Sequence, residues 1–214
     1  MGKTSYLRAL MVAFLLTATL PLHADNVSVV TVDTSSVAGT AGFLDFTFDP
    51  GPFITQSGFA TISAFSSDGT LGAPTITGDV SGTLPPSTTL NNDTPFNDYF
   101  TAFTFGNSLN FTLGLGGPAV DSPDGTSTSG STFAFSMFSS DESTPLLTAD
   151  SLDGFAFEVD VNLDGTAKLT NFSDATSIAG GVSSVPEPAS GWLFGGVIAF
   201  WAIGVRRRAF SGLR

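Results

Sequence analysis

Apolar and polar residues alternate along much of the chain between residues 43 and 172. The clearest stretch, 155–164, has an apolar side chain at every odd position and mostly polar side chains at the even positions. Shorter runs with the same period lie at 43–48, 103–105 and 133–138. Strict alternation over about 4–8 residues is typical of a β-strand with one buried face. These runs therefore predict strands, and their many phenylalanines predict the core.

Turn-forming residues separate these runs. Gly, Pro, Asp and Ser cluster at 49–52, 67–69, 84–86, 116–118 and 123–125. Short strands with turn signals about every 8–12 residues are typical of an all-β sandwich or barrel. We predict one antiparallel β-sandwich of the jelly-roll type, with about ten strands, over residues 25–182. The pattern predicts no helix between the two ends of the chain and a long polar loop at 116–131.

The N-terminal 24 residues have the three parts of a secretory signal peptide. Lys3 and Arg8 are basic, residues 9–20 are almost wholly apolar, and Ala24 offers a small residue at the cleavage site. A membrane anchor is the alternative. Twelve residues at about 1.5 Å each are too short for a hydrocarbon core of about 30 Å. We therefore expect cleavage after Ala24 and secretion through the translocon.

The C-terminal end reads as a membrane segment. Residues 189–205 carry no charge, and Arg206, Arg207 and Arg208 follow at once. Seventeen apolar residues reach the lower limit for a spanning helix. Arginines directly after the span favour leaving residues 206–214 in the cytoplasm. They also disfavour the alternative, a buried C-terminal helix of a globular domain. Residues 183–188 then form the linker between the domain and the helix.

The linker contains Val185, Pro186, Glu187 and Pro188 directly before the apolar segment and the arginines. This order of parts resembles the PEP-CTERM sorting signal of Gram-negative bacteria. The resemblance implies processing by an exosortase-type transpeptidase at or near this motif. It also implies transient anchoring in the inner membrane, delivery to the envelope surface or the medium, and an organism that makes exopolysaccharide. It covers about 30 residues and implies nothing firm about residues 25–182.

Charge is distributed very unevenly between the two ends and the middle of the chain. Of seven basic residues only Lys168 lies between residues 25 and 185, whereas eighteen of nineteen acidic residues lie there. The formal charge of that part is therefore −17. Such a surface attracts cations and repels phosphates, which excludes nucleic acid as a partner.

The residue types left after processing disfavour an enzyme. The only histidine, His23, belongs to the signal peptide, and the chain has no cysteine. Ser-His and Cys-His nucleophile systems therefore cannot be built. Paired carboxylates of a glycoside hydrolase remain a less favoured alternative, because Glu142 and Glu158 are the only glutamates between residues 25 and 185. We expect a non-enzymatic domain without a cofactor, unless calcium binds.

Calcium has one candidate loop. Asp160, Asn162 and Asp164 precede Gly165 in the D-x-N-x-D-G pattern of an EF-hand loop. The position that should hold a bidentate Glu is Asn171, and Lys168 has the wrong charge for its position. The favoured interpretation is a hairpin with a type I′ turn at Asp164-Gly165, joining strands 155–163 and 166–172. The three oxygen-bearing side chains would then share one solvent face and could still hold a weakly bound ion.

A second polar cluster comprises residues 91–93 and 97–99. It could form a calcium or glycan loop, but an Asx-rich turn is favoured because Asn and Asp readily bond their own backbone. Tyr99 is the only tyrosine that remains for stacking on a sugar ring. Our leading hypothesis is a structural or adhesive matrix protein associated with exopolysaccharide or biofilm. The alternative is a calcium-assisted glycan-binding module of the same fold.

Overall fold

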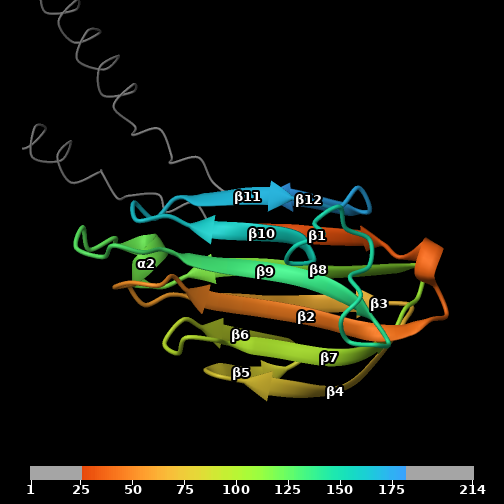
Figure 1. Cartoon of the computed structure of the whole chain (residues 1–214). Helices are drawn as coiled ribbons and strands as arrows, with labels where there is room; N and C mark the ends of the chain where they lie inside the picture. Colours follow the sequence, from red (N-terminus) through yellow and green to blue (C-terminus); the bar gives the residue numbers. More distant parts are fainter. Residues whose placement is uncertain (1–25, 182–214) are drawn as a thin grey trace, which may run out of the picture. The chain divides into compact units, whose positions relative to one another are not determined.

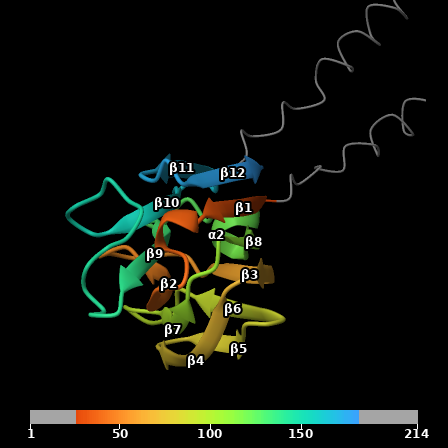
Figure 2. The same cartoon turned by 90° about the vertical axis from the view of Figure 1, so that its right-hand side faces the viewer.

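The computed structural model describes residues 26–181, which fold into a β-sandwich. Twelve strands form two antiparallel sheets of six strands each. Seen end-on in Figure 2, the sheets stand side by side as two layers. The predicted all-β sandwich is confirmed, with twelve strands rather than about ten. Short exposed strands such as β5 (Val80–Thr83) lack an apolar alternation, so the sequence pattern does not reveal them.

Sheet A has the strand order β12-β1-β8-β3-β6-β5. Its strands, in this order, are Thr176–Gly180, Val27–Asp33, Ser108–Gly116, Phe59–Ser67, Ser87–Asn91 and Val80–Thr83. Sheet B has the order β11-β10-β9-β2-β7-β4 and faces the viewer in Figure 1. Its strands are Ala167–Asn171, Phe155–Val161, Ser131–Ser139, Ala41–Pro50, Asp98–Thr104 and Thr70–Thr77.

Pairs of strands far apart in the sequence build both sheets. Strand β1 pairs with β8, β2 with β7, and β3 with β6, so the pairs are nested within one another. Strands β9 to β11 then extend sheet B beyond β2, and β12 covers the free edge of β1. Every one of these ladders is antiparallel.

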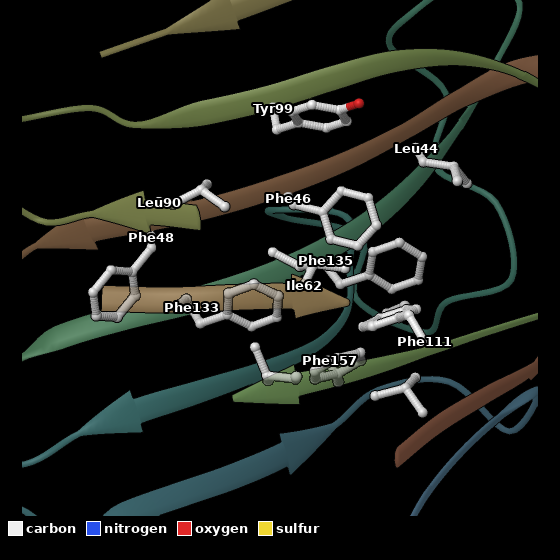
Figure 3. Close-up of a cluster of buried hydrophobic side chains, with 14 of the residues drawn as sticks. Leu44, Phe46, Phe48, Ile62, Leu90, Tyr99, Phe111, Phe133, Phe135 and Phe157 are labelled. Carbon is white, nitrogen blue, oxygen red and sulfur yellow. The ribbon is translucent and has the colours of Figure 1, made fainter. Parts of the chain in front are cut away.

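The core lies between the two sheets and is largely aromatic (Figure 3). Phe46 of β2 packs edge-on against Phe111 of β8, with ring centroids 5.3 Å apart, and tilted against Phe135 of β9 at 5.0 Å. All three rings are almost completely buried. Burying one such ring contributes about 1.5–3 kcal/mol. The alternation predicted at 43–48 and 133–138 therefore identifies Phe46 and Phe135 correctly as inward-facing.

Two short helical turns lie outside the sheets. Ser35–Val37 forms a 3-10 turn, η1, and Pro118–Asp121 forms a single α-turn, α2, with Pro118 at its first position. The long polar loop predicted at 116–131 therefore contains a helical turn, and β8 extends into its first residue. Within residues 26–181 no helix has the length and apolar character needed to cross a membrane. The predicted signal peptide and sorting tail lie outside the described residues.

Candidate functional site: the outer faces of the sandwich

The hairpin between β10 and β11 carries the candidate calcium loop. Strand β10 ends at Val161, and the amide of Asn162 donates to the carbonyl of Thr166 at 2.8 Å. Gly165 has φ +80° and donates to the carbonyl of Asn162 at 3.0 Å, whereas Asp164 does not have a positive φ. The predicted hairpin is confirmed. The type I′ turn is wrong, because it requires positive φ at both central residues; the loop instead has three residues and ends on a left-handed glycine.

The three oxygen-bearing residues of this hairpin do not share one strand face. Since β10 ends before Asn162, the period-two parity expected through Leu163 stops, and that leucine is half exposed. Asp160 accepts a hydrogen bond from the Thr132 hydroxyl at 2.9 Å. Asp164 accepts one from the Thr166 hydroxyl, which in turn accepts one from the Asn162 amide.

The side chains proposed as calcium ligands are therefore hydrogen-bonded to other residues of the protein. Thr166 donates to Asp164 through both its hydroxyl, at 2.6 Å, and its backbone amide, at 3.0 Å, and the two bonds lower the pKa of Asp164. Residues 26–181 contain no group of three or more Asp, Glu, His or Cys side chains placed to hold a metal ion. Calcium binding at Asp160, Asn162 and Asp164 stays a prediction.

A small pocket opens beside this hairpin. Thr55, Gln56, Ser129, Asn162 and Leu163 are among its lining residues, so three loops meet there. It has room for about one water molecule. A sugar ring does not fit into it without a rearrangement of these loops.

The asparagine-rich segment holds loops together. The Asn92 side chain donates to the Gln56 carbonyl and to the Ser131 hydroxyl, and it accepts the Gly58 amide. Asn97 is fully buried and donates to the carbonyls of Phe48 and Thr94. The segment does form a turn between strands, but its side chains bond their own backbone less than expected, since most of the bonds reach across 18 to 49 positions.

Tyr99 lies in the core and offers no surface for a sugar. Its exposed fraction is 1%, and its hydroxyl accepts the backbone amide of Leu84 at 3.0 Å. Figure 3 shows its ring above Phe46, between the sheets. The sequence pattern leaves this placement open, because a lone tyrosine suits either face of a strand.

The outer face of sheet B carries a pair of carboxyl groups that sequence reasoning missed. In the β2–β7 ladder Asp45 pairs with Phe100 and Thr47 with Asp98, which makes Asp45 and Asp98 diagonal neighbours on one face. The two carboxyl groups interact, and each shifts the pKa of the other. The Oδ1 atoms of both residues are buried without a partner. Residues 45 and 98 are far apart in the sequence, and parity alone does not say which strands are neighbours.

The surroundings of this pair explain its electrostatics. Phe43 and Phe100 stack beside Asp45 with ring centroids 4.7 Å apart, and Phe100 also contacts Phe138 at 6.4 Å. Because apolar rings and strand backbone replace water, desolvation raises the pKa of Asp45 from 3.8 to about 8, with further contributions from Asp98 and then Asp49. Desolvation also raises the pKa of Asp98 and that of Asp49.

Carboxylates in turns behave in the opposite way. Asp68 accepts the backbone amides of Asn107 and Ser108, at 2.8 and 3.0 Å, which lowers its pKa to about 2. Asp124 accepts the amides of Ser127 and Thr126, with the same result. Asp141 binds Thr144 through both its hydroxyl and its amide, which lowers its pKa as well. These aspartates act as structural acceptors that close loops.

The outer face of sheet A carries almost no charge. Apart from Asp33 at the end of β1, the six strands of this sheet contain no Asp, Glu, Lys or Arg. Serine, threonine and asparagine dominate its outward positions, and the Thr61 and Thr89 hydroxyls bond across β3 and β6 at 3.0 Å. Val27 and Val29 add exposed apolar atoms.

The remaining site residues lie outside the described part. These are Ala24 at the expected cleavage site, Val185, Pro186, Glu187 and Pro188 of the sorting motif, and Arg206, Arg207 and Arg208. The chain matches no protein-family model, and neither characterised proteins nor solved structures show a significant match to it.

Proposed function

We propose that this protein is exported, processed at its tail by an exosortase-type transpeptidase, and acts outside the cell as a non-enzymatic structural or adhesive β-domain. The signal-peptide pattern of residues 1–24 supports export. The motif Pro186-Glu187-Pro188, the uncharged segment 189–205 and the arginines after it support sorting. The mature domain resides at the envelope surface or in the surrounding matrix, in association with exopolysaccharide.

One observation carries the adhesive part of the proposal: the uncharged outer face of sheet A. Everywhere else the acidic side chains repel other anionic polymers. On this face, rows of hydroxyl and amide groups stand on a regular ladder, where a neutral hydroxyl-rich polymer can exchange hydrogen bonds with them. Such contacts need no metal and no titrating group. They are individually weak, so retention depends on many of them acting together.

Deleting residues 186–208 tests sorting. The full chain should be held at the envelope before processing, whereas the deletion variant should be released or accumulate unprocessed. Mass spectrometry of both mature termini measures where cleavage occurs. Identical fractionation and identical termini for the two proteins would contradict the sorting proposal.

A pull-down on purified exopolysaccharide tests adhesion. Thr112, in the centre of sheet A, pairs with Val29 on one side and Ser63 on the other. Thr112→Glu places a charge in the middle of this face and should reduce retention several-fold. Thr75→Glu, on exposed β4 of sheet B, is the matched control and should leave retention unchanged. Equal retention of both variants and the unaltered chain would mean that the outer face of sheet A does not bind the exopolysaccharide.

Calcium-assisted glycan binding is the alternative. Its ligands would be Asp160, Asn162 and Asp164, whose side chains are hydrogen-bonded to Thr132 or Thr166. Extracellular sites with dissociation constants of about 10⁻⁴–10⁻³ M would suffice. Retention that disappears with a chelator, together with heat in a calcium titration, would favour this alternative. Retention that a chelator leaves unchanged favours the structural domain.

We also infer that the sandwich is of the jelly-roll type. The nested pairs β1–β8, β2–β7 and β3–β6 support this assignment, since a jelly roll folds eight strands into two Greek keys. One difference is that β5 pairs with β6 in sheet A, leaving β4 at the edge of sheet B. Strands β9 to β12 then extend the two sheets.

A further inference from the structure

We propose that Asp45 and Asp98 share one proton and thereby form a pH-sensitive link between strands β2 and β7. The link holds while one of the two carboxyl groups is protonated. It fails when both ionise, because two like charges then lie side by side on the face of sheet B. This inference concerns the stability of the domain and is independent of its proposed adhesive role.

The register of the ladder brings the two carboxyl groups together, because Asp45 and Asp98 are diagonal neighbours on the outer face of β2 and β7. A carboxylate has no hydrogen to donate, so two neighbouring carboxyl groups can share a hydrogen bond only if one of them is a neutral carboxylic acid. The remaining Oδ1 atoms of both residues are buried and without partners. A second negative charge would therefore be neither hydrated nor hydrogen-bonded, which is the most costly state for a buried carboxylate.

Within residues 26–181 no positive charge lies near the pair to replace the proton. Asp49 lies two pairs further along the same face of β2 and is itself acidic. Strand β9, on one side of β2, and strand β4, beyond β7, contain no titratable residue. Glu158 and Asp160 follow on β10, and Lys168, the only lysine or arginine within residues 26–181, lies on β11 opposite Asp160. Two strands, β9 and β10, therefore lie between β2 and the strand that carries Lys168.

Asp45 is the member that holds the proton. It sits beside the stacked rings of Phe43 and Phe100, and its pKa is raised to about 8, while the hydrogen bond from Asp45 favours the ionised form of Asp98. A group whose pKa is higher in the folded state stabilises the fold below its unfolded value of 3.8. That contribution disappears as pH rises through about 8.

The position of the pair determines which strands separate when both carboxyl groups are ionised. Sheet B has the order β11-β10-β9-β2-β7-β4, so a break between β2 and β7 separates two strands from the other four. Strand β4 has no other partner in its sheet. We expect the amides of β7 and β4 to lose protection at alkaline pH before those of β9 and β10 do.

The test compares the melting temperature of the full chain, purified in mild detergent, with that of Asp45→Asn. The unaltered chain should melt about 5 °C lower near pH 8.5 than near pH 6. An asparagine at position 45 can donate its amide N–H to Asp98 at any pH, so the variant should lose most of this decrease. Asp98→Asn is the second variant and should flatten the profile in the same way. Asp153→Asn, in an exposed loop, removes the same charge and should keep the full decrease.

A direct measurement is the titration of the Asp45 carboxyl carbon by NMR. A midpoint near pH 8 supports the shared proton, and a midpoint below about pH 5 overturns it. Equal pH profiles for the unaltered chain and both asparagine variants would also overturn it. Adding calcium at pH 8.5 and measuring the melting temperature again provides one more test. If it restores the melting temperature of the unaltered chain but not that of Asp45→Asn, the pair binds a cation and the proton link is wrong.

Discussion

Asp45 on strand β2 and Asp68 in a turn are the same residue type, yet their pKa values are shifted in opposite directions. Desolvation and a neighbouring carboxyl group raise the pKa of Asp45 to about 8, whereas two backbone amides lower that of Asp68 to about 2. In a sheet interior the ladder already uses the backbone amides, so a carboxylate on its face finds few donors. In a turn the amides are free and point at the acceptor.

The comparison shows that net charge is a poor guide to the electrostatics of this domain. A formal charge of −17 counts every carboxylate equally. In the fold, turn carboxylates are structural acceptors that favour ionisation, and Asp45 is an acid that favours its neutral form.

The largest expected effect is a maximum in stability at mildly acidic pH. Asp68 and Asp124 stabilise the fold above pH 3.8, the pKa of an unperturbed aspartate, and lose that contribution as the pH falls towards about 2. Asp45 acts with the opposite sign and loses its contribution as pH rises towards about 8. The melting temperature of the full chain should therefore peak near pH 4–5 and fall by about 5–10 °C towards pH 8.5.

Salt sharpens this prediction. Repulsion among exposed carboxylates is screened at high ionic strength, whereas repulsion within a buried pair is screened much less. The alkaline decrease should therefore persist at about 1 M salt, where the Debye length is about 3 Å. A melting temperature that rises steadily from pH 4 to pH 8, or an alkaline decrease that salt abolishes, would break the comparison.

Asp68→Asn should produce an intermediate effect with the opposite pH dependence. Asp68 ties the β3–β4 turn to the β7–β8 turn through the amides of Asn107 and Ser108 and the Asn107 side chain. The variant should melt about 3 °C lower near pH 6 and show a shallower decrease towards acid. Its alkaline decrease should match that of the unaltered chain. Asp93→Asn, which is exposed, is the charge-matched control; an equal loss in both would indicate that charge, not hydrogen bonding, is responsible.

Thr132→Val should have the smallest effect. It removes the hydroxyl that donates to Asp160 at 2.9 Å while keeping the β-branched shape. We expect a free energy of unfolding lower by about 0.5–1.5 kcal/mol, measured by urea denaturation at pH 6. Thr31→Val, exposed on β1, should change it by less than about 0.5 kcal/mol. A Thr132→Val variant as stable as that control would mean that the bond to Asp160 contributes nothing.

Local pattern predicted the fold class because inward and outward positions alternate along each strand. Residues 157–161 and 133–135 illustrate this, since Phe157, Val159, Val161, Phe133 and Phe135 lie in the core as expected. A register shift between Phe155 and Phe157 interrupts the pattern, so Phe155 is only partly buried and Ala156 is buried instead. The same rule failed where a strand ended early, at Leu163, and where aromatic residues pack on the outside, as Phe43 and Phe100 do. It also missed β5, which has too little apolar surface to show a period.

The candidate site was likewise predictable only where its structure depends on adjacent residues. The hairpin at residues 162–166 follows from Asp164 and Gly165, because a turn depends on a few adjacent residues. Its turn type depends on the strands that flank it, and the sequence predicted the wrong one. The roles of Asn92 and Asn97 as loop connectors depend on partners more than 30 residues away, so the sequence offered only a generic turn.

The amino-acid sequence alone was enough to establish a strongly acidic, phenylalanine-rich chain with the alternation of a β-sandwich, since composition and period need no knowledge of neighbours. Tertiary structure decided that Tyr99 is buried, that one sheet face carries Asp33 as its single charged residue, and that Asp45 meets Asp98. Each of these outcomes depends on which strands pair. Pairing between strands distant in sequence is determined by burial and backbone hydrogen bonding over the whole sandwich, and no local pattern encodes it.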